Sequence, residues 1–245
     1  MESWLKKLGS FFKYTILHPQ WLSHRYHKAS QKILKTLNDS VILEIGSGDS
    51  NIGTLINSSN QLIKLDYPAT NQRYNQAPDI FADSAKLPVA DSSVDTALFL
   101  EVAEHVAHDK ESIQEIYRIL KPGGKFYFSI PFIYPMHDQP YDFRRYTLHG
   151  IKSLLSENGF EILKIIRHGN SLVTALQLVN LSILELCKNA LDRNSVTGLL
   201  LILFSYPICI LINLLALIAI PINNLNAACL GYFVIANKHE DKLIG

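Results

Sequence analysis

The chain has 245 residues, and its 23 lysines and arginines against 22 aspartates and glutamates give a formal net charge of +1. This balance excludes a nucleic-acid partner held by bulk charge, and a hydrophobic share of 48% excludes a disordered or fibrous chain. The length fits one large domain, or one domain with an addition. The charge is unevenly spread: residues 1–35 hold seven basic side chains against one acidic, whereas residues 195–236 hold none.

The first expected element is an amphipathic helix near the N-terminus. Large apolar side chains recur there at helical spacing, with the lysines off the stripe, at Trp4, Leu5, Leu8, Phe11 and Phe12. Such a helix can lie in the interface of an anionic bilayer, or it can pack on its own domain or on a second subunit. Because the lysines interrupt any apolar stretch typical of a secretory signal, we expect a cytoplasmic location.

From residue 30 onward the sequence alternates between strand and helix patterns. Apolar runs predict strands at 41–45, 61–66, 79–83, 94–101, 125–132 and 160–167. Helical spacing predicts one helix around 113–120, closed by Pro122-Gly123-Gly124, and a second at 148–155 with Thr147 as its N-cap. Repeated alternation of this kind predicts a parallel sheet with helices on both faces.

Residues 170–229 fall outside this alternation and look helical throughout. They carry only four charges, and the 27 residues 196–222 carry none, which exceeds the roughly 20 residues needed to span a bilayer. Pro207 and Asn213 interrupt this stretch near its middle, so we expect a bent hairpin rather than one straight span. If a further strand predicted at 231–238 joins the same sheet, both ends of the segment lie on one side of any membrane. A single transmembrane crossing is then excluded, and residues 170–229 form either a re-entrant hairpin or a soluble helical cap.

The strongest chemical signal is the strand end Glu44-Ile45-Gly46-Ser47-Gly48. A strand that ends in a carboxylate and runs into Gly-x-Gly can turn sharply and leave backbone amides open to a cofactor. Asp66 ends the next predicted strand, 20 residues after Gly46. A carboxylate at that place can accept hydrogen bonds from both ribose hydroxyls of an adenosine moiety. The structural alternative for Asp66 is an Asx turn before Pro68.

On these residues the sequence resembles the class I S-adenosylmethionine-dependent methyltransferases, especially the type 11 group that includes the ubiquinone and menaquinone methyltransferases. The resemblance spans residues 38–168 and rests on several motifs in the right order: VILEIGSGDS, LDYP, DIFADSAKLPVADSSVD, TALFLEVAEHV and IYRILKPGGKFYFSIPF. It implies an α/β, Rossmann-like fold with a mostly parallel seven-stranded sheet, an antiparallel last strand and an added apolar helical insert. The domain organisation then comprises a basic, aromatic helical segment at 1–35, the cofactor-binding domain at 36–169 and 230–245, and the insert at 170–229.

The resemblance also implies a site for S-adenosylmethionine, with S-adenosylhomocysteine as the product. The expected cofactor-binding residues all lie at or just beyond strand ends: Glu44, Gly46, Ser47, Gly48, Asp66, Tyr67, Asp83, Ser84 and Glu101. The glycine loop frames the methionine portion, Asp66 holds the ribose, and Asp83 with Ser84 meets the adenine. Glu101 lines the floor beneath the sulfonium. One departure is Ser50, which stands where the family's glycine motif has a third glycine.

A polar cluster follows the fifth predicted strand, on the edge of the sheet where the cofactor is expected. Its side chains indicate an acceptor-binding set made of Tyr134, His137, Tyr141, Asp142 and Arg145. His137 can take a proton from a hydroxyl near neutral pH and is the expected base. His105 is the competing base, with a helix cap or a cofactor contact as its alternative role. The cluster is similar to that of a subgroup met among bacterial polysaccharide and cell-envelope methyltransferases; the alternative is a loop whose Asp142–Arg145 pair merely fixes its shape.

Metal-assisted chemistry is not expected, because no group of His, Cys and carboxylate residues has metal-ligand spacing along the sequence. The three cysteines, Cys187, Cys209 and Cys229, lie among apolar residues and are expected to be reduced, buried or membrane-facing thiols.

The sequence therefore predicts methyl transfer to an oxygen, or secondarily to nitrogen or carbon, of a small-molecule, glycan or lipid-linked acceptor. Two alternatives stay open. One is a membrane-associated scaffold that keeps the cofactor fold without turnover. The other is an NAD(P)-dependent oxidoreductase, which is disfavoured because Asn51 stands where G-x-G-x-x-G requires its third glycine. Further expected partners are a membrane on its cytoplasmic face, contacted through 1–29 and 170–229, or a second copy of the chain, and no nucleic acid.

Overall fold

The structure is a computed structural model that describes residues 12–70 and 77–239. Within these residues the chain divides into two compact units. The sheet unit comprises residues 30–132, 136–166 and 231–239, and the helical unit comprises residues 12–29, 133–135 and 167–230. The apolar stripe predicted near the N-terminus lies outside the described residues, except for Phe12.

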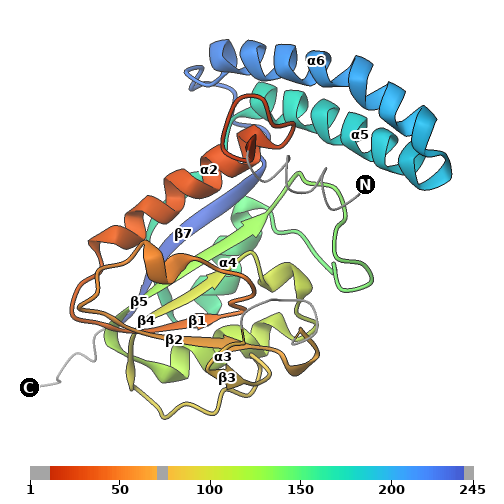
Figure 1. The fold of residues 1–245 in the computed structure, drawn as a ribbon. Coiled ribbons are helices and arrows are strands. Elements are labelled where there is room, and N and C mark those ends of the chain that lie inside the picture. The colour runs from red at the N-terminus through yellow and green to blue at the C-terminus, as the bar shows by residue number, and fades with distance from the viewer. Residues whose placement is uncertain (1–11, 71–76, 240–245) are drawn as a thin grey trace, which may run out of the picture. The chain divides into compact units, whose positions relative to one another are not determined.

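The sheet unit is built on seven strands (Figure 1): β1 (Val41–Ile45), β2 (Gln61–Asp66), β3 (Ile80–Phe81), β4 (Val94–Leu100), β5 (Leu120–Pro131), β6 (Phe160–Arg167) and β7 (Gly231–Lys238). Their order across the sheet is β3-β2-β1-β4-β5-β7-β6. β1 pairs in parallel with β2 and β4, β2 with β3, and β4 with β5, whereas β7 runs antiparallel to β5. The predicted α/β fold, with a mostly parallel seven-stranded sheet and an antiparallel last strand, is confirmed.

The largest difference from the predicted strands is at β5, which begins at Leu120 rather than at residue 125. Pro122, expected to help close the preceding helix, therefore lies within the strand. The pairing with β4 shifts register between Val94 and Thr96, so the extra residues bulge out of the ladder. A proline is tolerated at such a bulge because its missing N–H is not needed for pairing.

Two helices of the sheet unit follow the predicted pattern: α3 (Asp109–Ile119) and α4 (Leu148–Glu157). In α3, Ile113, Ile116 and Ile119 are fully buried on one face. Thr147 caps α4 as predicted, because its hydroxyl accepts a hydrogen bond from the Gly150 N–H at 3.1 Å. Short 3₁₀ turns complete the unit: η1 (Lys32–Thr36), η2 (Ile52–Thr54), η3 (Pro68–Thr70) and η4 (Ala103–His105).

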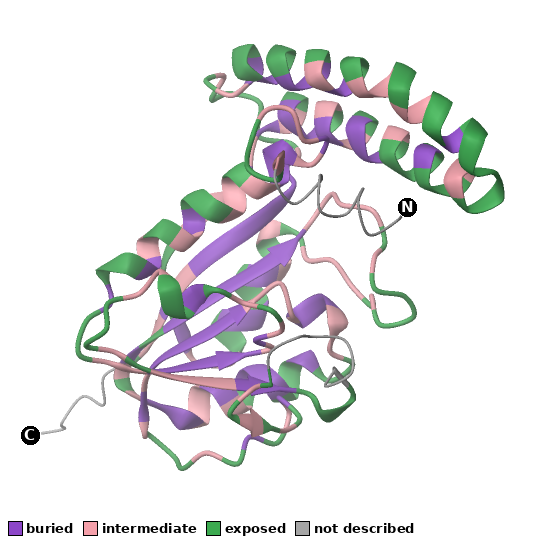
Figure 2. Cartoon of the chain, in the orientation of Figure 1, coloured by how far each residue is buried: buried purple, intermediate pink, exposed green. Residues whose placement is uncertain are grey.

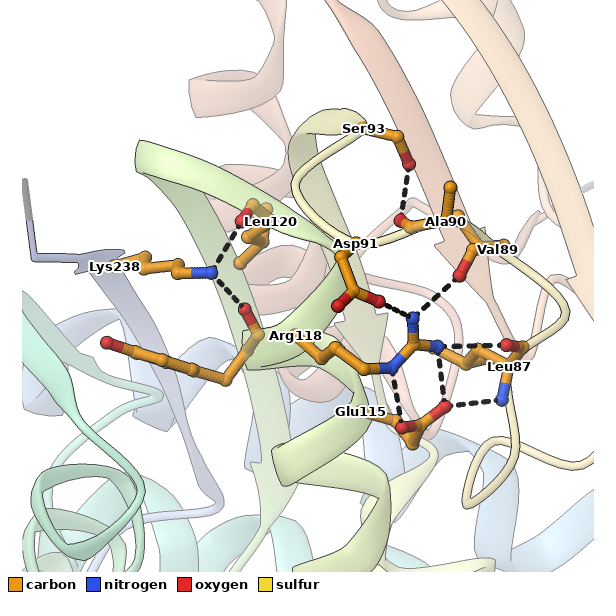
Figure 3. A network of polar contacts seen from close by, with 10 residues as sticks. Leu87, Val89, Ala90, Asp91, Ser93, Glu115, Arg118, Leu120 and Lys238 are labelled. Carbon is orange, nitrogen blue, oxygen red and sulfur yellow. Dashed lines mark hydrogen bonds and ion pairs between the residues drawn. The ribbon is translucent and has the colours of Figure 1, made fainter. Parts of the chain in front are cut away.

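Arg118, near the end of α3, fixes the loop that leads into β4 (Figure 3). Its guanidinium donates hydrogen bonds to two backbone carbonyls and two carboxylates of this neighbourhood: those of Leu87, Val89, Asp91 and Glu115. Lys238 of β7 donates to the carbonyls of Tyr117 and Leu120, both at 2.9 Å, where the last carbonyls of α3 lack helical partners. α3 is thereby tied to both the preceding loop and the last strand.

The core of the sheet unit lies on β1, β4, β5 and β7. Its buried members are large and apolar: Leu34, Leu37, Ile42, Ile52, Leu98, Tyr127 and Phe233. Each such side chain stabilises the fold by about 1.5–3 kcal/mol relative to exposure. Figure 2 shows these central strands almost wholly buried. Their carboxyl ends are therefore firmly placed, and the functional residues follow those ends.

The helical unit contains most of α2 (Trp21–Gln31) together with α5 (Ser171–Arg193) and α6 (Ser195–Ala219). α5 and α6 form a hairpin that turns at Asn194, whose side chain accepts from the N–H groups of Val196 and Thr197. Gly198 lies four residues after Asn194, and a Cβ atom at this position would lie 2.6 Å from Leu191. Glycine at this position lets the two helices pack closely just after the turn.

The expectation that Pro207 and Asn213 break the apolar stretch is wrong, because both lie inside the continuous helix α6. Pro207 removes a single helical hydrogen bond. The Asn213 side chain forms hydrogen bonds with other segments and not with its own helix. It donates to the carbonyls of Ile16 and His18 and accepts from the Asn180 side chain at 2.9 Å. The hairpin therefore turns at Asn194 instead.

Candidate functional site

A pocket of about 690 Å³ lies at the carboxyl ends of β1, β2, β3 and β4. Six of the nine predicted cofactor-binding residues line it: Gly46, Asp66, Tyr67, Asp83, Ser84 and Glu101. Ligand pockets of about 300–1,000 Å³ accommodate cofactor-sized molecules. The remaining three, Glu44, Ser47 and Gly48, lie in or beside β1, just behind this wall. The structure thus brings the predicted set together, while the ligand of each residue stays a prediction.

The glycine loop turns as its sequence predicts. Gly46 has φ 74° and Gly48 has φ 47°, both in the left-handed region that favours glycine. A Cβ on Gly46 would lie 2.5 Å from a methyl carbon of Val102. The N–H groups of Gly46 and Ser47 both donate to the Leu65 carbonyl, at 2.8 and 3.1 Å. Only glycine therefore lets the chain leave β1 this close to the end of β4.

Asp66 is positioned by two backbone amides. Its Oδ2 accepts from the Gly48 N–H and its Oδ1 from the Tyr67 N–H, each at 2.7 Å. A carboxylate oxygen has two lone pairs, so each oxygen keeps acceptor capacity toward the pocket. The bond to Tyr67 reaches the next residue and not the one two positions on, Pro68, which has no N–H, so it is not the Asx turn of the structural alternative. These bonds leave room for the ribose role.

Asp83 and Ser84 follow β3, the neighbour of β2, and also line the pocket. The Asp83 Oδ1 accepts from the Ala85 N–H at 2.9 Å, and the Ser84 hydroxyl lies 2.7 Å from that of Ser112 in α3. Behind the glycine loop, burial raises the pKa of Glu44 above its ordinary value. These partners fix the side chains before any ligand arrives.

Glu101 follows β4 with φ 56°, a left-handed conformation that costs a non-glycine residue about 1–2 kcal/mol. Its N–H donates to the Ser129 carbonyl at 3.0 Å, which holds the residue at the strand end. Strained residues of this kind cluster at functional sites. Glu101 lines the pocket beside His105.

Three side chains converge next to this wall. The Glu104 Oε1 lies 3.7 Å from the His105 Nε2 and 3.9 Å from the His137 Nε2, and the two imidazole rings meet edge to face at 4.8 Å. Glu104 is fully buried. Burial, and then the neighbouring Glu101, raise its pKa well above the ordinary value. Sequence reasoning missed Glu104, although it directly precedes His105.

The acceptor-binding residues predicted from the sequence are only partly brought together. Of the five, Tyr141 lines the pocket, and so does His105, which was predicted as the competing base. Asp142 and Arg145 form a forked ion pair, at 2.5 and 2.8 Å, which lowers the pKa of Asp142 to about 2. Asp142 in turn holds His137, accepting from its backbone N–H at 2.9 Å. The Asp142–Arg145 pair therefore fixes the shape of this loop, as the structural alternative described.

Residues 133–135 belong to the helical unit, so the acceptor-binding role of Tyr134 stays a prediction. There its hydroxyl accepts a hydrogen bond from the Gln20 side chain at 3.3 Å. Sequence reasoning also missed Asp138 and Phe143, which line the pocket. Neither lies within a regular pattern, and only the course of the 133–147 loop places them there.

Comparison with known proteins matches residues 43–128 to the model of the methyltransferase domain family. A protein of Mycolicibacterium smegmatis named as a probable S-adenosylmethionine-dependent methyltransferase is 27% identical over 176 residues, covering 62% of this chain and 68% of that protein. The chain is a class I S-adenosylmethionine-dependent methyltransferase. Other curated relatives are matched over 20–54% of their own length, so they do not define this methyltransferase's acceptor.

Solved structures share the fold of this methyltransferase. An S-adenosylmethionine-dependent methyltransferase from Mesorhizobium loti aligns with a TM-score of 0.53 at 15% identity, covering 90% of this chain and 98% of its own. The [4+2]-cyclase SpnF aligns equally well, with a TM-score of 0.53 at 16% identity over 88% of this chain and 80% of its own. Likeness at this level shows the fold alone.

The residues present fit the cofactor that this family uses. The pocket has the volume of a cofactor site and places the Asp66 carboxylate, already oriented by two amides, on its wall. Glu101 adds a second carboxylate, which suits a positively charged sulfonium. The methyltransferase pocket therefore combines acceptors for a ribose with negative charge for the methyl-donating group.

Proposed function

We propose that this methyltransferase methylates an oxygen of a small-molecule, glycan or lipid-linked acceptor. The observation that carries the proposal is His105, whose imidazole lines the cofactor pocket. Its Nδ1 donates to the Tyr141 carbonyl at 2.8 Å, so in the neutral ring the lone pair lies on Nε2. A base of this kind beside the methyl donor suits a hydroxyl acceptor, which must lose a proton to become a good nucleophile.

The cofactor supplies an electrophilic methyl group on a sulfonium. The chain's own part is to bind, orient and deprotonate: Asp66 would hold the ribose, Asp83 and Ser84 the adenine, and Glu101 the region of the sulfonium. The acceptor O–H bond breaks as its proton passes to His105, an oxygen–carbon bond forms, and the carbon–sulfur bond breaks with its electron pair left on sulfur. His105 replaces His137 as the proposed base, because His105 lines the pocket and His137 is not among the pocket-lining residues.

This proposal is tested with a methyl-labelled donor and fractionated small-molecule, glycan and lipid extracts. We expect label on an oxygen of one acceptor class, and His105→Ala should lower turnover about 10²- to 10⁴-fold. His149→Ala is the matched control, since His149 is exposed on α4. Label on nitrogen or carbon would overturn the oxygen assignment. No label in any fraction, with cofactor binding intact in calorimetry, would favour a scaffold without turnover.

We also propose that the helical unit contacts the cytoplasmic face of a membrane. α5 and α6 are each long and apolar enough to cross a bilayer by length and composition alone. α6 has no charged residue, and large apolar side chains are exposed along it, among them Leu203, Phe204 and Ile218. Because β6 and β7 belong to one sheet, the hairpin between them leaves and returns on the same side. The charges of α5 gather near the Asn194 turn, which favours shallow, monotopic contact over deep insertion.

Flotation with anionic liposomes tests the membrane contact. We expect the protein to float, and replacing Leu203, Phe204 and Ile218 with Asp should abolish flotation without unfolding, because all three side chains are at least 65% exposed. Leu163→Asp, on an exposed position of β6, is the control. A chain that never floats and elutes as a stable dimer would make this apolar face a subunit interface instead.

A further inference from the structure

Glu104, His105 and His137 bring together three side chains of the kinds that bind metal ions in proteins. Their ligand atoms, one carboxylate oxygen and two imidazole nitrogens, all lie within 4.8 Å of one another. The three residues come from η4 and from the loop after β5, so 32 positions separate the two histidines. The sequence therefore shows no metal-ligand spacing here, and the expectation of a metal-free site rested on that spacing.

Both imidazoles are oriented through their other nitrogen. The Nδ1 of His105 donates to the Tyr141 carbonyl at 2.8 Å, and the Nδ1 of His137 lies 3.3 Å from the Asp142 carboxylate. Arg145 in turn fixes Asp142 with two hydrogen bonds. A histidine that binds a metal commonly donates its second N–H to a carbonyl or carboxylate in this way, which sets the tautomer and aims the lone pair of Nε2.

The third side chain, Glu104, supplies a buried carboxyl group without a hydrogen-bond partner. Glu104 has a relative exposure of 0%, and within the described chain neither of its carboxylate oxygens has a hydrogen-bond partner. Both Nε2 atoms face its Oε1 at 3.7 and 3.9 Å, which is too long for a hydrogen bond. An acceptor oxygen opposed by two nitrogen lone pairs is unfavourable unless a proton or a metal ion lies between them, and a metal ion satisfies all three atoms at once.

We propose that Glu104, His105 and His137 bind a divalent first-row transition-metal ion. Ligands about 2.0–2.1 Å from such an ion are about 3.4 Å apart in tetrahedral geometry, so side-chain adjustments of about an ångström or less close the site. Two imidazoles with one carboxylate suit Zn²⁺, Mn²⁺ or Co²⁺, whereas Mg²⁺ and Ca²⁺ favour sites made of oxygen alone. Three protein ligands leave coordination positions open, as in catalytic sites.

The open positions give the ion a role in acceptor binding, and this role rests on the proposed function. His105 lines the cofactor pocket, so an ion on its Nε2 would be adjacent to the acceptor. A hydroxyl bound to such an ion has a lowered pKa and loses its proton more readily. In the ion-bound enzyme His105 is a ligand rather than the base, and the acceptor's proton passes to solvent. The acceptor class is then one whose hydroxyl can coordinate a metal.

Titration of the chelator-treated full chain with Co²⁺ tests the site without any acceptor. We expect one equivalent to bind with visible d–d absorption, and Zn²⁺ to displace it. Glu104→Ala and His137→Ala should each weaken binding at least 10-fold, and His149→Ala should not. Glu104→Gln, which keeps the volume of the buried side chain, serves as a second variant should Glu104→Ala fail to fold. Absence of the absorption band, or unchanged affinity in both folded variants, would overturn the proposal.

Two further measurements separate this proposal from the proposed function. S-adenosylmethionine binding is measured by calorimetry on the same variants, and oxygen methylation is measured with and without added Mn²⁺ or Zn²⁺. Methylation that survives chelation unchanged overturns the role of the ion while the proposed function stands. Co²⁺ binding lost in the variants, combined with label only on carbon or nitrogen, supports the metal site while the proposed function fails.

Discussion

The two units of this chain bury opposite kinds of side chain. In the sheet unit, the strands enclose large apolar residues and the polar groups gather at the strand ends around the pocket. In the helical unit, α6 is largely exposed along its length (Figure 2). Most of its large apolar side chains are exposed, while Asn180, Asn213 and Gln177 are fully buried. The comparison teaches that the two units place their polar side chains differently: around a pocket in the first, and between the helices in the second.

The buried amides of the helical unit act as connectors. Asn213 links α5 through Asn180 and holds the carbonyls of Ile16 and His18, and Gln177 donates to the Pro19 carbonyl at 3.2 Å. These hydrogen bonds join segments distant in sequence, and each buried amide would cost free energy if it were left without a partner. Polar residues thus build the site in one unit and hold the structure in the other.

The largest expected effect that separates the units is on cofactor affinity. Asp66→Ala removes a carboxylate proposed to bind both ribose hydroxyls, and we expect affinity for S-adenosylmethionine to fall about 10- to 150-fold, or about 1.5–3 kcal/mol. Titration calorimetry measures it, with Asp66→Asn as the milder variant. Asn213→Ala is the matched change in the helical unit and should leave this affinity alone. Equal affinity of wild type and Asp66→Ala would remove the ribose assignment.

A second, smaller effect is expected on the stability of the helical unit. Asn213→Ala leaves two carbonyls and the Asn180 side chain without its hydrogen bonds, which costs about 1–3 kcal/mol. Hydrogen exchange of α6 amides should accelerate accordingly, while β4 and β5 amides keep their protection. Asn226→Ala, at an exposed asparagine, is the control. Acceleration spread evenly over both units would show that they unfold as one.

The smallest expected effect is a pH dependence confined to the helical unit. His168 is buried beside Tyr26 and His27, and burial lowers its pKa to about 3. The unfolded chain takes up a proton below about pH 6.5 while the folded chain does not, so stability falls as the pH drops from 6.5 toward 3. Between pH 7.5 and 5.5 we expect His168 to account for a loss of roughly 1 kcal/mol, a share removed by His168→Phe and kept by His149→Phe. His24, whose pKa burial lowers to about 4, and His18 add to the loss in the same direction and keep their share in both variants. The measurement is hydrogen exchange of the α6 amides. Exchange rates that do not change with the folding equilibrium across this pH range in the wild type would contradict the neutral, buried state of His168.

The sequence by itself determined the sheet and the strand ends that line the pocket, because local signals encode both. Apolar runs mark the strands, Gly46 and Gly48 permit the turn that the structure has, and Asp66 stands at a strand end where a parallel sheet must open. The helical hairpin before the last strand was also predictable from pattern and order, whereas the antiparallel direction of that strand followed from the resemblance to the methyltransferase family. The turn of that hairpin was not predictable, since Pro207 is a local signal that the packing of α6 overrides.

Only the tertiary structure decided how the acceptor side is built. From the sequence pattern alone, Glu104 is only the neighbour of a possible helix cap, and His137 is only part of an irregular loop. Their meeting depends on how the loop after β5 folds back, fixed by Arg145 on Asp142 and by the Phe143 N–H on the Glu104 carbonyl at 2.8 Å. Tyr134, only three residues before His137, belongs to the other unit. Periodicity reports on neighbours along the chain, whereas convergence of distant loops is set by packing and hydrogen bonds that no local pattern records.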